Sequence, residues 1–286
     1  MPNLSGLKAE IISVGEITNI TDAMQLVASA KLRRAGKKIT ETQQYVSEVY
    51  SVFNEIIQQT DDSPFLKPDE TTFKKTLWVV VNSNLGLCGG YNTNINKEVM
   101  HQIKPDDEIY ALGSKAVAFY SARKIKIIKS RVDIDVNFSS SIAGEIGQEL
   151  MGYYTSHQFD EIKLAYTKFI NNVTFTPTTL RLFPIVKNKV VDKAINATNL
   201  QVEFEPDAQT ILEKTINLYL NTVLYGTIAE SQVSEQASRR TAMDAATKNG
   251  KEMVEKLNIK YNRERQAAIT QEISEIVGGA NALAEN

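Results

Sequence analysis

The stretch Ser234–Leu283, SEQASRRTAMDAATKNGKEMVEKLNIKYNRERQAAITQEISEIVGGANAL, decides the fold of this chain of 286 residues. It lies within a longer segment, Asp207–Ala282, that contains no proline. Proline inside a helix costs ~3 kcal/mol, so the segment can form one helix of more than ~100 Å. A narrow stripe of small and apolar residues recurs at helical spacing: Ala242, Ala246, Met253, Leu257, Tyr261, Ala268, Ile269, Ile273 and Ile276. Such a stripe is typical of two closely packed helices rather than of a helix in a globular core.

The N-terminal end of the chain shows a related pattern. No proline occurs between Asn3 and Ser63, and apolar residues recur at steps of mostly three and four: Leu4, Leu7, Ile11, Val14, Ile17, Ile20, Met24, Val27 and Leu32. The pattern predicts one helix or two over residues 4–59, spanning roughly 80 Å. The two ends can bury their stripes only on each other or on a partner. The sequence therefore predicts an antiparallel coiled coil in which segment 1–60 pairs with segment 207–286.

The middle of the chain, residues 75–190, has a different character. The run Leu77–Val81 is continuously apolar and bounded by turn residues, which suits a buried strand. Further strand candidates and helix-like stretches alternate along this region: strands at 108–112, 125–129, 162–169 and 175–183, helices near 94–103, 114–122 and 142–157. This alternation predicts a small α/β domain with a mostly parallel sheet, inserted between the two helical ends. Residues 188–205 are expected to form a polar connection.

Composition narrows the possible functions. Apolar residues make up 42% and charged residues 23%, so the chain can bury a sizeable core. Lys and Arg number 32 against 34 Asp and Glu, and this net charge of −2 argues against wholesale nucleic-acid binding. A single cysteine and two histidines argue against disulfides and metal centres. Because neither a long apolar run nor a signal-peptide pattern occurs, we expect a soluble intracellular protein.

The segment Asn82–Asn92, NSNLGLCGGYN, looks most like part of an enzyme. It follows a predicted strand and opens a predicted helix, where free backbone N–H groups can bind anions. It matches neither dinucleotide- nor triphosphate-binding motifs and has no lysine, so a glycine-shaped turn is the simpler interpretation. Cys88 lacks a nearby base, since His101 and His157 are poorly placed for that role. We therefore expect no catalytic residue, cofactor or metal on this chain.

Basic residues cluster in both helical ends. One cluster is Arg239, Arg240, Lys248, Lys251, Lys256, Lys260, Arg263 and Arg265, and the other is Lys31, Arg33, Arg34, Lys37 and Lys38. Two interpretations remain open. The clusters are either solvated helix faces or a basic band that meets acidic loops of a partner.

Three stretches carry a resemblance to a known family. Ser234–Leu283, Ile20–Ala35 (ITDAMQLVASAKLRRA) and the turn Ser83–Asn92 resemble the gamma subunit of F-type ATP synthases, in matching order and over nearly the whole chain. The resemblance implies a Rossmann-like α/β domain between two shaft helices that form an antiparallel coiled coil. It implies a central-stalk rotor inside a hexamer of three alpha and three beta subunits, with ATP, ADP and Mg bound on those partners. It further implies an epsilon subunit and a membrane ring as partners, hydrogen ion transport, and a place on the cytoplasmic side of a bacterial membrane.

The resemblance also implies roles for individual residues. Arg265 and Gln266 match a pair that contacts a beta-subunit loop, and Thr270 and Glu272 match polar residues of the same region. The remaining matches are the shaft and basic-band residues Met24, Arg33, Arg34, Arg239 and Arg240, and the apolar tip held in the hexamer's sleeve, Ile273, Ile276 and Val277.

The chain departs from the family pattern at two places. Glu10–Met24 reads EIISVGEITNITDAM where several basic residues are usual, and Ser83-Asn84-Leu85 stands where Ser-Asp-Arg or Ser-Asp-Lys is usual. These departures leave three interpretations: an ordinary rotor, a rotor of a specialised F-type-like ATPase that has a different foot partner and is not coupled to a proton ring, or a free-standing coiled-coil scaffold. The intact Arg265-Gln266 pair speaks against the scaffold.

Overall fold

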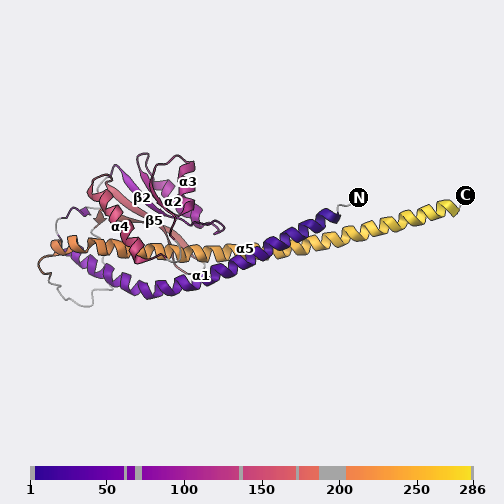
Figure 1. Cartoon of the computed structure of the whole chain (residues 1–286), viewed down its shortest axis with the longest axis horizontal. Coiled ribbons are helices and arrows are strands. Elements are labelled where there is room, and N and C mark those ends of the chain that lie inside the picture. The colour runs from indigo at the N-terminus through magenta and orange to yellow at the C-terminus, as the bar shows by residue number, and fades with distance from the viewer. Residues whose placement is uncertain are drawn as a thin grey trace. The chain divides into compact units, whose positions relative to one another are not determined.

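The computed structural model describes residues 4–60, 63–67, 73–134, 138–171, 174–186 and 204–284. A long helix, an α/β region and a second long helix follow one another along the chain (Figure 1). The first helix is α1 (Leu4–Gln59) and the last is α5 (Ala208–Ala284), each a single uninterrupted element. The expected fold class is confirmed. The predicted connection at 188–205 lies almost wholly outside the described residues.

The α/β region contains a five-stranded sheet in the order β4-β3-β2-β5-β6. Its strands are β2 (Thr76–Val81), β3 (Glu108–Leu112), β4 (Ile127–Arg131), β5 (Glu161–Phe169) and β6 (Phe175–Phe183). All neighbouring strands are parallel except the β5–β6 pair, so the predicted mostly parallel sheet is confirmed. The helices are α2 (Tyr91–Gln102), α3 (Ser114–Ala122) and α4 (Ser140–Thr155). A short parallel pair, β1 (Leu66–Lys67) with β7 (Ile185–Val186), was not expected.

Strand β4 begins later than predicted for a local reason. After α3, Lys124 adopts a φ of 58°, and Ile125 N donates to Tyr120 O, which closes the helix end. Residues 125 and 126 therefore belong to the helix exit, and regular strand structure starts at Ile127.

The chain divides into two compact units that do not follow the helix boundaries. Unit 1 comprises Met1–Ala28 and Arg240–Asn286, and unit 2 comprises Ser29–Arg239. Each unit therefore contains part of α1 and part of α5.

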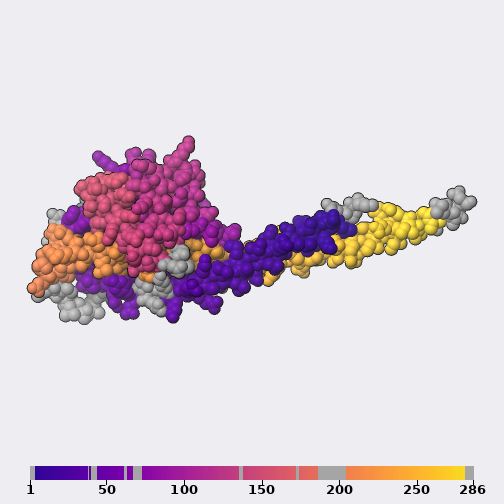
Figure 2. All heavy atoms as spheres, viewed as in Figure 1, coloured from indigo at the N-terminus to yellow at the C-terminus, as the bar shows by residue number. Residues whose placement is uncertain are grey.

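In unit 2 both faces of the sheet are buried. Leu77, Val79 and Val81 of β2 pack into one cluster with α4 and the first part of α5, while Trp78 and Val80 pack against α2 and α3 on the other face. Successive strand side chains point to opposite faces, so a continuous apolar run is what a sheet covered on both sides requires. Figure 2 shows the α/β elements (magenta) packed along the orange part of α5.

In unit 1 the two helices meet along a polar and small-residue seam. Thr21 Oγ1 lies 2.8 Å from Thr247 Oγ1, and Gln25 Nε2 donates to Asp244 Oδ1 over 3.1 Å. Thr18 is buried opposite Gly250, where an added Cβ would lie 2.3 Å from the threonine hydroxyl. Rising numbers on α1 meet falling numbers on α5, so the pairing in this unit is antiparallel.

The predicted apolar stripe of α5 is buried only in part. Met253, Ile269, Ile273 and Ile276 are between 47% and 71% exposed. The register that sets Thr18 against Gly250 brings the start of α1, Leu4, beside the region of Glu264. Beyond that point α5 has no α1 residues to pack against among those described. The N-terminal helix therefore does not cover Ile269, Ile273 and Ile276, which leaves burial on a partner as the remaining expectation for them; Met253 is exposed although it lies within the paired region.

Gly250→Ala should open the seam locally. The new methyl group would overlap the Thr18 hydroxyl, and overpacking of this kind typically costs about 1–3 kcal/mol of unfolding free energy. Amide hydrogen exchange around residues 14–21 measures the opening. Adding Thr18→Ala should restore protection, and Gly15→Ala, where no atom lies within 4 Å, serves as the control. Equal exchange in G250A and G15A would contradict the close packing.

Candidate functional site

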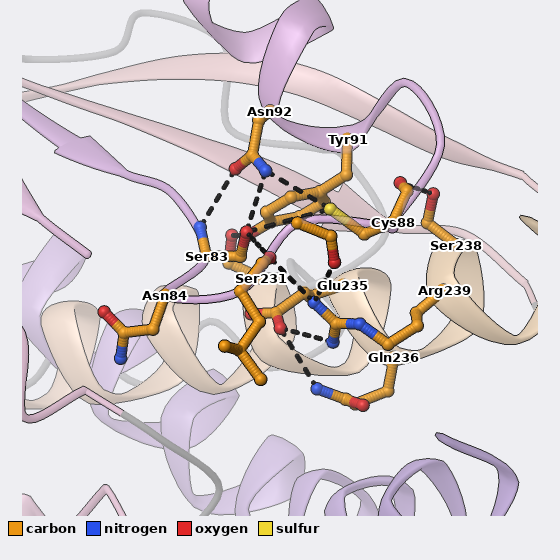
Figure 3. Close-up of polar contacts among 12 residues, drawn as sticks. Ser83, Asn84, Cys88, Tyr91, Asn92, Ser231, Glu235, Gln236, Ser238 and Arg239 are labelled. Atoms are coloured by element: carbon orange, nitrogen blue, oxygen red, sulfur yellow. Dashed lines mark hydrogen bonds and ion pairs between the residues drawn. The ribbon is translucent and has the colours of Figure 1, made fainter. Parts of the chain in front are cut away.

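The glycine turn at the carboxyl end of β2 is held by a compact polar network in unit 2 (Figure 3). Asn92 Nδ2 donates to Ser83 Oγ over 2.7 Å, and Asn92 Oδ1 accepts from Ser83 N over 3.0 Å. Ser83 Oγ in turn donates to Leu85 O over 2.6 Å. From α5, Ser238 Oγ donates to Cys88 O over 2.6 Å. The turn is thus fixed both to the start of α2 and to α5.

Arg239 supplies the second link between the turn and α5. Its Nη2 donates to Leu85 O over 3.0 Å and to Gly86 O over 3.3 Å, while Nη1 pairs with Glu235 Oε1 at 2.6 Å. Only 9% of the Arg239 side chain is exposed. Arg239 therefore does not belong to an exposed basic band, because its guanidinium is buried and bonded to Glu235 and to backbone carbonyls. The neighbouring Arg240 is exposed.

Glu235 is a mostly buried carboxylate in this network. Burial raises its pKa above the ordinary value, and the nearby Arg239 guanidinium lowers it part of the way back. Gln236 Nε2 also donates to Glu235 Oε1 over 3.2 Å. A buried charge of this kind is tolerated only while it remains paired and hydrogen-bonded.

Small hydroxyl residues of α5 connect the helix to the sheet and to α2. Ser231 Oγ lies 2.8 Å from the Tyr91 hydroxyl and accepts from Thr167 N over 3.2 Å. Ser234 Oγ donates to Thr167 O over 3.2 Å. Burial raises the pKa of Tyr91 far above its ordinary value, so it stays a neutral partner. The arrangement is a structural clamp, which fastens α5 to the α/β elements.

Among the contacts described for the Cys88 thiol, none is to a base. Cys88 is buried, and its Sγ contacts the Asn92 amide at 3.2 Å and the Ser83 hydroxyl at 3.7 Å. An amide is not a base, and both histidines are exposed. Among the described residues, no cluster of three His, Cys, Asp or Glu side chains could hold a metal ion. That the chain carries neither catalyst nor cofactor stays a prediction.

A cleft of about 780 Å³ lies at the opposite, amino-terminal edge of the sheet. Five lysines and three carboxyl groups line it, but their charges are largely used within the fold. Lys75 and Lys126 both pair with Glu108, and Asp107 accepts from the backbone of Thr76 and the indole of Trp78. This edge serves mainly to anchor the strand starts.

None of the helices among the described residues is both long and apolar enough to cross a membrane.

The predicted partner-contact residues lie on the exposed C-terminal part of α5 in unit 1. Arg265, Gln266, Thr270 and Glu272 are all exposed, and Thr270 Oγ1 donates to Gln266 O over 3.0 Å. At 3.6 residues per turn, two adjacent lanes form along the helix. One lane is Arg265, Ile269, Glu272 and Ile276, and the other is Gln266, Thr270, Ile273 and Val277. Each lane begins with a polar residue, Arg265 or Gln266, and ends with an apolar one, Ile276 or Val277.

The other candidate residues divide between the units. Arg33 and Arg34 are exposed in unit 2, whereas Met24 is half-buried in unit 1. Ile17 and Ile20 of α1 are 56% and 60% exposed, so the segment that departs from the family pattern presents apolar side chains outward. The Lys38 side chain lies outside the described residues.

Comparison with known proteins places the chain in a family. A family model described as ATP synthase matches residues 3–283. The ATP synthase gamma chain of Mesoplasma florum is 60% identical over 283 residues, which is 99% of either chain. That of Mycoplasma capricolum is 60% identical over 281 residues, 98% of this chain and 99% of the other. The gamma chain of Desulfitobacterium hafniense is 37% identical over 286 residues, 99% and 100% of the two chains.

Solved structures agree at the level of the fold. A chain of the Euglena gracilis mitochondrial ATP synthase rotor has a TM-score of 0.67 and 15% identity, covering 93% of this chain and 98% of that one. A second structure of the same enzyme, with F1 and the c-ring, gives a TM-score of 0.70 and 16% identity over 98% and 94%. The full-length match to the family model and the 60% identity of full-length relatives are decisive. The chain belongs to the family of ATP synthase gamma chains, the central-stalk subunits of F-type ATP synthases.

Proposed function

We propose that the helices of unit 1 turn inside a ring of three alpha and three beta subunits, and that this rotation couples to ATP turnover on the beta subunits. The observation that carries the proposal is the free end of α5. After Glu264, α5 is no longer paired with described residues of α1. In this part of the helix Arg265 and Gln266 are exposed, and so are Ile273, Ile276 and Val277. Bare apolar side chains at a helix end are expected where a partner covers them. Different contacts with successive subunits would bias each one toward a different state, which is coupling by differential binding.

The partners follow by analogy with the relatives. The solved structures are a central stalk with its c-ring from Tetrahymena thermophila, the Euglena gracilis rotor, and an assembly of OSCP, F1 and c-ring from the same Euglena enzyme. For this chain we propose the alpha and beta subunits, an epsilon subunit and a proton-conducting membrane ring as partners. We place it on the cytoplasmic side of a bacterial membrane, with ATP, ADP and Mg bound by the other subunits, no catalytic residue of its own and no nucleic acid among its partners.

A tagged chain isolated from its native cell in mild detergent would test the assembly. Three alpha and three beta chains per copy, with epsilon and a membrane ring, would support the ordinary rotor. The same hexamer with other chains and no ring would support the specialised ATPase, for which the outward Ile17 and Ile20 are the structural argument. If no hexamer is isolated with the chain, both rotor interpretations are contradicted and the coiled-coil scaffold is the remaining one.

Arg265→Ala combined with Gln266→Ala should slow ATP hydrolysis by the assembled complex about tenfold, because hydrogen bonds to charged groups are worth about 1.5–3 kcal/mol. Both side chains are exposed in unit 1, so the folding of this chain should not change. The control is Asn258→Ala with Asn262→Ala, two exposed amide side chains on the same helix that lie outside the basic cluster. If the two double variants hydrolyse ATP at equal rates, Arg265 and Gln266 do not take part in the contact that couples rotation to hydrolysis.

A further inference from the structure

The cleft at the amino-terminal edge of the sheet, about 780 Å³ in volume, keeps part of its charge unpaired. Its lining residues lie in three segments of unit 2: the approach to β2, the turn before β3 and the turn between α3 and β4. Lys74 lies in the first of these segments and Lys124 in the third, and both side chains are exposed. Neither ammonium group has a hydrogen-bond or ion-pair partner among the described residues. Two positive charges therefore remain available at one cleft.

The walls that carry these lysines are held by hydrogen bonds. In the turn before β3, Lys104 N donates to Asp107 Oδ2 over 2.9 Å, and Lys104 Nζ donates to Phe73 O over 2.8 Å. The second of these bonds joins the turn to the residue that precedes Lys74. Lys124 occupies the tight turn that ends α3, with a φ of 58°. The walls are thus fixed before a ligand binds, which lowers the entropic cost of binding.

Glu108 also lines the cleft, and one of its carboxylate oxygens lacks a donor. Lys75 Nζ and Lys126 Nζ both pair with Oε1, at 2.7 and 2.9 Å. Oε2 is buried and accepts no hydrogen bond from a described residue, and the whole side chain is only 6% exposed. Buried carboxylate oxygens almost always have a donor. The orphan oxygen is a second, independent sign that a polar group is missing from this cleft, and the two lysines that share one carboxylate keep a net positive charge beside it.

The balance of charge indicates which class of ligand fits. Five lysines against three carboxyl groups leave the lining with a surplus of two positive charges. A phosphate monoester carries about −1.5 to −2 charges near neutral pH, whereas a phosphodiester or a carboxylate carries a single negative charge. Ile103, Pro105 and Ile125 add an apolar wall to the cleft. Ligand sites commonly combine such a wall with a few polar groups that fix the orientation of the ligand.

We propose that this cleft binds a small organic phosphate monoester, such as a mononucleotide. Lys74 and Lys124 bind the phosphate oxygens, and the organic part of the ligand lies against Ile103 and Ile125. The inference goes beyond the proposed function, because it concerns binding to this chain alone and assigns no step in rotation.

The test titrates the full chain with AMP and with inorganic phosphate at low salt. Lys74→Gln with Lys124→Asn removes both unpaired ammonium groups, and asparagine tolerates the positive φ at position 124. The matched control is Lys115→Gln with Lys214→Gln, which removes two exposed lysines of unit 2 that lie outside the cleft. Because all four lysines are exposed, both double variants should unfold at the same denaturant concentration as the wild type.

We expect AMP to bind the K74Q/K124N chain at least about tenfold more weakly than it binds the control, because two charge-assisted contacts are lost. Added salt should weaken AMP binding to the wild type. Inorganic phosphate should bind the wild type more weakly than AMP does, because it has no organic part to place against the apolar wall.

Hydrogen exchange locates the site without any substitution. AMP should protect the backbone of the turn at 104–107 and of the turn at 124–126. Protection only elsewhere, equal affinity of the two double variants for AMP, or no AMP binding at millimolar concentration would overturn the proposal. Binding to vesicles that contain phosphatidylglycerol, without binding to AMP, would also overturn it, because that headgroup is a diester. None of these results bears on the hexamer, which the isolation of the tagged chain tests separately.

Discussion

Replacing Arg239 with methionine should cost about 3–5 kcal/mol of unfolding free energy. The substitution keeps much of the side-chain volume but leaves the Glu235 carboxylate without its 2.6 Å partner. It also removes the donor to the carbonyls of Leu85 and Gly86, so the glycine turn loses one of its two links to α5, while the Ser238–Cys88 hydrogen bond remains. Denaturant unfolding of the full chain, followed by circular dichroism, measures the loss. Arg240→Met is the control, because that exposed neighbour should change stability by less than about 0.5 kcal/mol.

Two further measurements separate charge from packing in the R239M result. Adding Glu235→Gln should recover a large part of the loss, since the buried charge is then gone as well. The loss should also shrink on acidification. Burial raises the pKa of Glu235 and Arg239 lowers it, so the variant's carboxyl titrates at a higher pH than the wild type's. When the pKa of a carboxyl group is higher in the folded than in the unfolded chain, the folded state is favoured at a pH below the unfolded-state pKa. That stability is lost as the pH rises through the folded-state pKa. A deficit that is equal at pH 5 and pH 8, and that E235Q leaves unchanged, would argue for packing alone.

The order of elements was predictable because it depends on gross sequence patterns. Proline is absent over two long segments, and each of these became one helix. The alternation of strand and helix signals between them correctly indicated a mostly parallel sheet. In β2 the continuous run from Leu77 to Val81 predicted burial on both faces, which the two clusters confirm. Boundaries were less accurate where a single residue sets them, as the positive φ of Lys124 does before β4.

The burial of Arg239 could not be read from helix periodicity alone. In sequence it is one of several basic residues, and only tertiary contact reveals that its guanidinium binds backbone carbonyls 153 and 154 positions away. A weak signal did exist. Ser231, Ser234 and Ser238 recur at helical spacing, which marks a lane where another element approaches closely. Likewise, the exposure of Ile273 and Ile276 follows from the length difference between the helices rather than from their own pattern. The roles of Arg265, Gln266, Thr270 and Glu272 stay predictions until the assembled complex is measured.

Gly113→Ala should be the most damaging single substitution argued for this chain, with a cost of more than ~4 kcal/mol. Gly113 connects β3 to α3 with a φ of 96°, which L side chains rarely adopt. An added Cβ would lie 2.2 Å from the backbone oxygen of Asn82. Neither side can yield easily: Gly113 N donates to Arg131 O and Asn82 N donates to Leu112 O, both over 2.8 Å. To relieve the overlap between the new methyl group and Asn82 O, the carboxyl ends of β2 and β3 must therefore move apart.

The expected outcome for G113A is a chain that is insoluble, or that unfolds at far lower denaturant concentration than the wild type. Gly152→Ala provides the control with identical chemistry. Gly152 lies within α4 and has no atom within 4 Å of an added Cβ, so alanine there should stabilise the helix by up to about 1 kcal/mol. The end of β2 that Gly113 touches is also where the glycine turn begins. Hydrogen exchange in a partly folded G113A should therefore rise first around Ser83 and Asn84. A G113A chain as stable as G152A would mean that the two strand ends are not held together in the way described.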